Sequence, residues 1–245
     1  MTEAATGALP DRAQVVSVGG GVIGCSIAYH LTQLGWSDVV LVERHSLTAG
    51  TTWHAAGLIT SAGMTDETAL FMSRYSRDLY SRLEAETGHS TGFREVGHIS
   101  LATNPGRLES LRRSSAWMHG FGVHEVEISP SEVAALWPLL RTDDVLAGFM
   151  VADEGRADPV GVATSLAKGA RARGARIFEG VSATGVEQRG GDVGRIRHHD
   201  EDDVGVLREP GLAFVGVVAR EDDRAALGAL EDDVAMRRIV RIGRA

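Results

Sequence analysis

A glycine-rich turn near the start of the chain has residue types and a spacing that can bind a dinucleotide. Gly19, Gly21 and Gly24 follow the pattern Gly-x-Gly-x-x-Gly, and Glu43 lies about 20 residues further on. The glycines would let the main chain approach a pyrophosphate, and the N-terminus of the next helix would stabilise its negative charge. The carboxylate can accept hydrogen bonds from ribose hydroxyls, and an acid here disfavours the 2′-phosphate of NADP. The pattern therefore predicts a site for NAD or FAD.

A second candidate is the loop of residues 50–58, which combines small residues with one aromatic and one nucleophilic side chain. Its sequence is Gly-Thr-Thr-Trp-His-Ala-Ala-Gly-Leu, so its main chain can approach a flat ligand closely. The imidazole of His54 could act as a nucleophile. A loop histidine taken by itself is more often an ordinary surface or hydrogen-bonded residue, so both interpretations stay open at this point.

Weaker candidates lie between the turn and the end of this loop. Arg44 could contact the adenosine ribose or cap the preceding strand. The hydroxyls of Ser46, Thr51 and Thr52 could donate to pyrophosphate or flavin oxygens, although serine and threonine are also ordinary turn residues.

The elements that would position these residues form a nucleotide-binding unit. Residues 13–18 read as a short strand, residues 25–34 have apolar groups at helical spacing, and residues 38–43 form an apolar strand that ends in an acid. This is a β-turn-α-β unit of about 30 residues.

The rest of the chain predicts a second module and a return to the first sheet. We expect helices over residues 68–86, 105–119 and from Pro130, and strands over residues 98–103, 123–128 and 146–152. A helix over residues 159–173 and two strands over residues 174–178 and 181–188 would then rejoin the first sheet. The predicted domain boundaries are 13–95 and 153–190 for the nucleotide-binding domain, 96–152 for a partial substrate-side module, and 191–245 for an atypical tail.

Composition narrows the class of protein. The 245 residues are 43% apolar, which is enough for a globular core, and the net charge of −8 argues against a nucleic-acid partner. The single cysteine excludes an internal disulfide, no apolar run is long enough to span a membrane, and the start lacks a secretory signal, so we expect a cytoplasmic protein. No metal site is expected, because the neighbouring His198 and His199 would point to opposite faces of a strand.

The sequence resembles the flavin-dependent N-methylglycine oxidoreductases, which comprise sarcosine and dimethylglycine dehydrogenases and oxidases within the D-amino-acid-oxidase-like superfamily. The resemblance covers about residues 13–190 and rests on residues 15–24, 43–44, 50–58, 96–99, 137–140, 153–159 and 174–176. It implies an α/β fold: a Rossmann-like FAD-binding domain of the glutathione-reductase type with an inserted partial α+β substrate module.

The resemblance also implies a chemistry and a set of site residues. His54 matches the histidine that carries FAD covalently in this family, and Val181 matches a position whose main chain holds the adenine edge, although a core valine is almost as good an interpretation. A secondary or tertiary amine such as sarcosine or dimethylglycine would give hydride to the flavin, with oxygen or an electron-transfer flavoprotein as acceptor. The implied FAD contacts are Gly19, Gly21, Val22, Ile23, Gly24, Glu43, Arg44, Ser46, Thr51, Thr52, His54, Ala56, Gly57, Leu58 and Val181. Catalytic residues are not identified, since the family's lie mostly in a later part of the chain.

The family pattern stops being recognisable after residue 191. Acidic clusters lie among arginines there. In the whole chain 24 of the 25 basic residues are arginine, which indicates a GC-rich coding sequence, and in such DNA a shifted reading frame stays open and yields Arg, Gly, Ala, Asp and Val. We therefore expect a frameshifted or disordered tail and a truncated sheet with unpaired edges. Two alternatives to an active amine oxidoreductase follow: a non-catalytic fragment of such an enzyme, and an NAD-dependent Rossmann dehydrogenase, which the loop of residues 50–58 disfavours.

Overall fold

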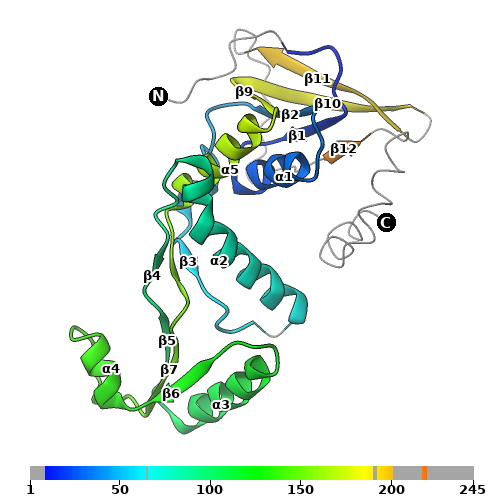
Figure 1. Cartoon of the computed structure of the whole chain (residues 1–245). Coiled ribbons are helices and arrows are strands. Elements are labelled where there is room, and N and C mark those ends of the chain that lie inside the picture. The colour runs from blue at the N-terminus through cyan, green and yellow to red at the C-terminus, as the bar shows by residue number, and fades with distance from the viewer. Residues whose placement is uncertain (1–8, 65, 190–191, 201–216, 220–245) are drawn as a thin grey trace. The chain divides into compact units, whose positions relative to one another are not determined.

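The computed structural model describes residues 9–64, 66–189, 192–200 and 217–219. The chain divides into two compact units, each formed from separate stretches of sequence (Figure 1). The first unit takes Met1–Ala55, Leu83–Ser90 and Pro159–Ala245, and the second takes Ala56–Arg82 and Thr91–Asp158. The second unit is thus wider than the predicted module of residues 96–152.

The first unit is built on a four-stranded sheet in the order β12-β1-β2-β9. Its elements are β1 (Val15–Val18), α1 (Val22–Gln33), β2 (Val39–Glu43), the 3₁₀ turn η1 (Thr52–His54), α5 (Pro159–Ala172), β9 (Arg176–Glu179) and β12 (Val217–Ala219). Strands β1, β2 and β9 are parallel, which confirms the predicted β-turn-α-β unit. The four valine and leucine residues of β2 are buried on both faces, as expected of a central parallel strand.

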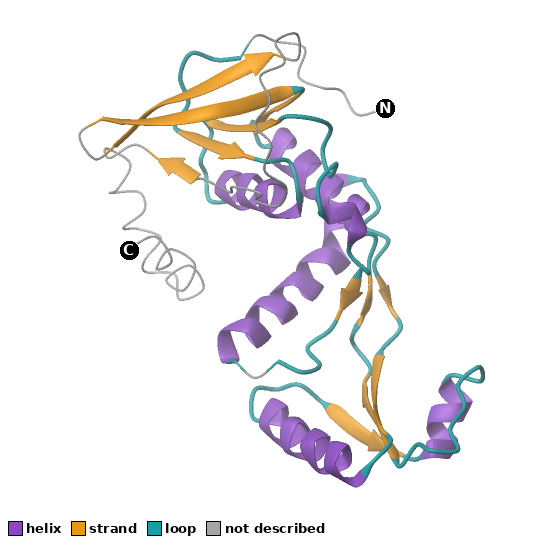
Figure 2. Cartoon of the chain, turned by 180° about the vertical axis from the view of Figure 1, so that it is seen from behind, coloured by secondary structure: helices purple, strands orange, loops and turns teal. Residues whose placement is uncertain are grey.

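The two faces of this sheet are covered by different elements. Helices α1 and α5 contact each other on one face, and a two-stranded ribbon of β10 (Val181–Arg189) and β11 (Asp192–Asp200) lies over the other (Figure 2). Val181 packs there in a buried apolar cluster with Val40, Val42 and Phe178.

The later strands differ from the expectations in three respects. Strand β9 rejoins the first sheet, but β10 pairs antiparallel with β11, so the strand of Val181 is hydrogen-bonded in a separate ribbon. Residues 192–200 form that second strand, while the atypical character of residues 191–245 as a whole stays a prediction. The edge of β1 is also paired, because β12 joins it antiparallel with Val15 opposite Ala219. The other residues after 200 lie outside the described part of the chain.

The second unit consists of two small antiparallel sheets with helices. One sheet has the order β3-β8-β4, with β3 (Leu58–Ile59), β8 (Gly155–Arg156) and β4 (Arg94–Glu95). The other has the order β5-β7-β6, with β5 (His98–Ala102), β7 (Ala147–Val151) and β6 (Glu125–Ile128). The helices are α2 (Glu67–Thr87), whose last turn belongs to the first unit, α3 (Pro105–His119) and α4 (Pro130–Leu136). Ser129 and Glu132 form a capping box at the start of α4, which explains why this helix begins where the sequence predicts.

Candidate dinucleotide-binding site

The glycine-rich turn connects β1 to α1, and two of its glycines are required by the backbone. Gly19 has a φ of +106°, a conformation that side-chain-bearing residues rarely adopt. A Cβ atom on Gly24 would lie 1.9 Å from the carbonyl oxygen of Gly19, so α1 can approach the turn this closely only with glycine there. The first and last glycines of the motif therefore have the turn and packing roles that the sequence predicts.

The N-terminus of α1 is suited to an anion. Gly21 is the N-cap residue, and the first turn of the helix contains no acidic side chain. Val22 donates its main-chain N–H to Oγ1 of Thr52 at 2.9 Å, and a Cβ on Gly21 would lie 3.1 Å from the same oxygen. The buried hydroxyl of Thr52 thus lies beside the positive end of the helix, where the pyrophosphate of a dinucleotide would bind.

Glu43 lies at the carboxyl end of β2 and faces the turn. Its Oε2 atom accepts a hydrogen bond from the main-chain N–H of Gly20 at 2.6 Å, and its Oε1 atom accepts one from His45 at 2.9 Å. A carboxylate oxygen can accept two hydrogen bonds, so each oxygen keeps one acceptor position for a ribose hydroxyl. The turn, the helix N-terminus and this carboxylate fit the adenosine and pyrophosphate parts that NAD and FAD have in common.

The loop after β2 presents most of its predicted site side chains to solvent. Arg44, Ser46, Thr51 and His54 are exposed, whereas Thr52 is buried. The ring centroids of Trp53 and His54 are 3.7 Å apart, with an angle of 33° between the planes. The imidazole of His54 is therefore accessible, and the indole of Trp53 lies against it at a tilt.

Three predicted contacts, Ala56, Gly57 and Leu58, belong to the second unit. Gly57 has a φ of +74° and accepts a hydrogen bond at its carbonyl from the N–H of Ala157 at 2.8 Å. Leu58 begins β3 opposite Arg156 and is exposed. Val181 is a buried residue of the first unit, as the core interpretation expects, and its contact with adenine stays a prediction.

Three further residues of this region have roles that the sequence did not predict. Gly20 holds Glu43 through its N–H, and a Cβ on it would lie 2.6 Å from Leu47. Thr48 is buried with a φ of +68° and donates its N–H to the carbonyl of Gly20 at 2.9 Å. Glu179 is bonded to the loop after β2. Only Glu179 carries a signal in the sequence, as an acid at the end of a strand, and that signal has meaning only once β9 is known to pair with β2.

Cys25 lies behind the turn and has no reactive character. Its Sγ atom donates to the carbonyl of Gly20 at 3.6 Å. Burial raises the pKa of this thiol to about 12, so it stays protonated at neutral pH.

Within the described residues, no three histidine, cysteine or acidic side chains are grouped so as to hold a metal ion. No helix in that part of the chain is long and apolar enough to cross a bilayer.

Comparison with known proteins gives a consistent set of similarities. Residues 14–215 match the family model "FAD dependent oxidoreductase". The chain is 39% identical to human mitochondrial sarcosine dehydrogenase over 76% of its length, and 38% identical to rat mitochondrial dimethylglycine dehydrogenase over 73%. It is 40% identical over 78% of its length to the mouse mitochondrial pyruvate dehydrogenase phosphatase regulatory subunit.

The matched regions are only parts of these relatives. The chain spans 20%, 21% and 22% of their respective lengths, about a fifth in each case. Among solved structures, L-proline dehydrogenase from P. horikoshii matches 78% of this chain and 50% of its own chain, with a TM-score of 0.72 and 26% identity.

Proposed function

The chain belongs to the family of FAD-dependent oxidoreductases, and we propose that it forms the FAD-binding part of an enzyme that oxidises a secondary or tertiary N-methyl amine. Family membership confirms the predicted α/β fold class with a Rossmann-like FAD-binding domain. It favours FAD over NAD as the dinucleotide. Sarcosine and dimethylglycine are the proposed substrates, because two relatives are dehydrogenases of these amines.

The observation that carries the proposal is the arrangement of the glycine-rich turn, the N-terminus of α1 and Glu43. The helix N-terminus would stabilise the pyrophosphate. The hydroxyl of Thr52, which accepts the N–H of Val22, could donate its own proton to a phosphate oxygen there. Glu43 would bind the ribose through its remaining acceptor positions. Bound FAD would supply the oxidising chemistry, and the chain would contribute orientation and electrostatics.

We further propose that FAD is attached covalently to His54: an imidazole nitrogen would replace one hydrogen of the flavin's 8α-methyl group, and oxygen would take up the two electrons and two protons released. The imidazole is exposed at the end of η1, and its ring is held against Trp53, so a nitrogen nucleophile is available without rearrangement of a core. Attachment would prevent loss of the cofactor and make it a stronger oxidant.

A second candidate function is a non-catalytic one. A relative as similar to this chain as the two dehydrogenases is named as a regulatory subunit, so a chain of this family at this level of identity need not belong to an enzyme. A chain that binds FAD without turning over an amine would fit that function. For the catalytic candidate, oxygen or an electron-transfer flavoprotein stays the proposed electron acceptor. The cytoplasmic location of the chain stays a prediction, since the mammalian relatives are mitochondrial by name.

The test is retention of flavin by the full chain. The protein is produced with FAD, precipitated with acid, and examined by absorbance and intact mass together with His54→Ala and His45→Ala. His45 is a matched control, because it is an exposed histidine in the same loop. Flavin that survives acid in the wild-type chain and His45→Ala but not in His54→Ala would support covalent attachment.

The other outcomes separate the parts of the proposal. Flavin that binds but is released by acid from the wild-type chain would refute the covalent bond and leave the FAD site standing. A chain that binds no flavin would refute the cofactor site. Anaerobic bleaching of bound flavin by sarcosine or dimethylglycine would then distinguish the enzyme from the non-catalytic candidate.

A further inference from the structure

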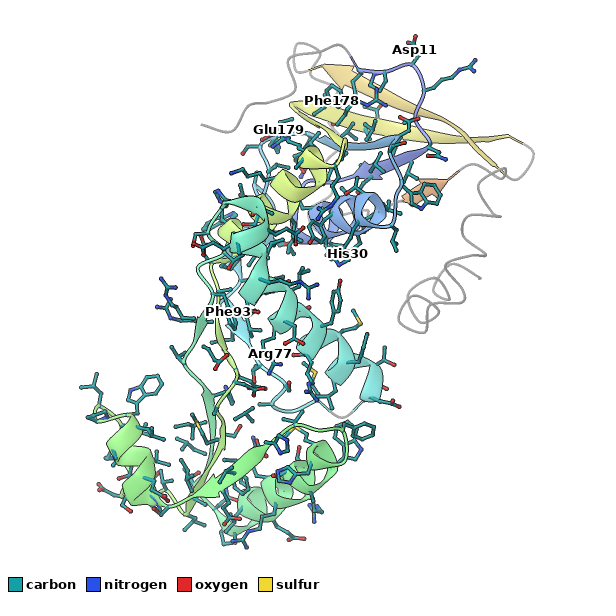
Figure 3. The ribbon with its side chains drawn as sticks, viewed as in Figure 1. Asp11, His30, Arg77, Phe93, Phe178 and Glu179 are labelled. Atoms are coloured by element: carbon teal, nitrogen blue, oxygen red, sulfur yellow. The ribbon has the colours of Figure 1, made fainter. Side chains whose placement is uncertain are left out.

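A second carboxylate lies at the same edge of the sheet as Glu43. Strands β2 and β9 are parallel neighbours, and their last residues, Glu43 and Glu179, are register partners. Figure 3 labels Phe178 and Glu179 at the end of β9. Ligands of open parallel sheets bind outside the carboxyl ends of the strands, so both acids are placed at the edge where a dinucleotide would lie.

Glu179 is hydrogen-bonded to the loop of residues 44–51, which joins β2 to η1. Its Oε2 atom accepts the main-chain N–H of Leu47 at 2.8 Å. Its Oε1 atom lies 3.5 Å from Nη2 of Arg171, and both side chains are only about one fifth exposed (21% and 20%). The next residue, Gly180, donates its N–H to the carbonyl of His45 at 3.0 Å. The end of β9 therefore fixes this loop at two main-chain positions.

The same loop is pressed against the glycine-rich turn. Thr48 donates its N–H to the carbonyl of Gly20, and the side chain of Leu47 leaves no room for a Cβ on Gly20. Thr48 is a β-branched residue with a φ of +68°, a conformation that costs energy and persists only where the surroundings hold it. The bond from Leu47 to Glu179 immediately precedes this residue and supplies such a hold.

We infer that Glu179, paired with Arg171, is a positioning residue of the FAD site. It sets the loop of residues 44–51 against the glycine-rich turn, so that the main-chain groups around Gly20 and Glu43 are ready for the cofactor. The inference rests on the proposed function, because it requires that the chain binds FAD. Glu179 would change the affinity for FAD without contacting FAD itself.

The chain offers a matched control at the opposite edge of the same sheet. Asp38 precedes β2, accepts the main-chain N–H of Gln14 at 2.9 Å, and lies 2.5 Å from Nη2 of Arg176. Like Glu179 it accepts a main-chain N–H and forms an ion pair with an arginine, but at the amino ends of the strands. Asp38→Ala should lower stability as Glu179→Ala does, while only Glu179→Ala should change FAD binding.

The experiment compares the full chain with Glu179→Ala, Glu179→Gln and Asp38→Ala by FAD titration, thermal unfolding without FAD, and amide hydrogen exchange at Leu47. We expect Glu179→Ala to weaken FAD binding about tenfold, because a hydrogen bond to a charged group is lost. Glu179→Gln keeps an acceptor for Leu47 and should stay within about threefold of wild type. Asp38→Ala should bind FAD as the wild type does, and Leu47 should exchange faster only in Glu179→Ala.

Two results would overturn the inference: FAD affinity of Glu179→Ala within about twofold of wild type, or an equal loss in Asp38→Ala. If the wild-type chain binds no FAD, the proposed function fails. The exchange data then decide separately whether Glu179 is an anchor, that is, whether its bond to Leu47 holds the loop of residues 44–51. Faster exchange of Leu47 in Glu179→Ala then supports the anchor, and unchanged exchange refutes it. Should Glu179→Ala not fold, unprotected exchange of Leu47 in the wild-type chain would overturn the anchor as well.

Discussion

The substitution Gly24→Ala tests the packing of α1 against the glycine-rich turn. The new Cβ atom would lie 1.9 Å from the carbonyl oxygen of Gly19 and 3.1 Å from its carbonyl carbon. Contacts of a Cβ below 3.0 Å are essentially never seen, and the obstacle is main chain that cannot rotate away. The helix must therefore move from the turn by about 1 Å, with loss of packing against the sheet.

Two opposing effects decide the magnitude. Alanine is a better helix former than glycine by about 1 kcal/mol, which favours the variant. Forced overpacking costs about 1–3 kcal/mol, and a clash with main chain belongs at the upper end of that range. We expect a net loss of about 2 kcal/mol in the free energy of unfolding and weaker FAD binding, because the displaced helix carries the anion-binding N-terminus.

The assay is urea unfolding followed by far-ultraviolet circular dichroism, with Gly106→Ala as control. Gly106 lies in the first turn of α3, and a Cβ there would meet only Asn104 Oδ1 at 3.5 Å, an ordinary contact. Gly106→Ala should therefore be neutral or stabilising by up to about 1 kcal/mol. Equal or greater stability of Gly24→Ala relative to wild type would refute the steric reasoning.

Three further substitutions test other contacts. Thr52→Val removes the acceptor of the Val22 N–H and should lower the free energy of unfolding of the chain without FAD by about 1 kcal/mol; an unchanged thermal midpoint would contradict this. Tyr29→Phe removes a hydroxyl that donates to both oxygens of Glu86 at 2.8 Å, and should cost about 1 kcal/mol, an amount that a double-mutant cycle with Glu86→Ala should assign to this pair. Burial raises the pKa of Glu125, whose Oε2 atom has no hydrogen-bond partner within the described residues. The folded chain therefore holds the proton of this carboxyl more tightly than the unfolded chain does. The free energy of unfolding falls as pH rises above the ordinary glutamate pKa, where the unfolded chain loses this proton first. Glu125→Gln should therefore be more stable than wild type at pH 7, with the difference vanishing below about pH 4, and a gap in urea midpoints that does not depend on pH would show the reasoning to be wrong.

The parts of the structure that the sequence predicts well are those with local causes. The turn from Gly19 to Gly24 and the start of α4 at Ser129 each depend on residues within one or two turns of chain. Strand pairing has no such local cause: nothing near Val181 indicates that β10 pairs with β11 instead of with the first sheet.

The site divides in the same way. Glu43 and the glycines are found from spacing, whereas the conformation of Thr48 and the bond from Leu47 to Glu179 depend on strands that meet only in the folded chain. The exposure of His54 was also open in the sequence, because a loop composition allows either a buried or an accessible imidazole.

The position of β2 between β1 and β9 has a consequence for how the protein is made. β1 is available as soon as β2 has been synthesised, but β9 follows only after the whole second unit. Until then the other edge of β2, whose first four residues are apolar and buried, has no native partner, and long-range parallel pairing is intrinsically slow. The nascent chain therefore exposes an aggregation-prone edge while residues 44–175 are synthesised, and its yield in the cell should depend on chaperones more than its final stability would indicate.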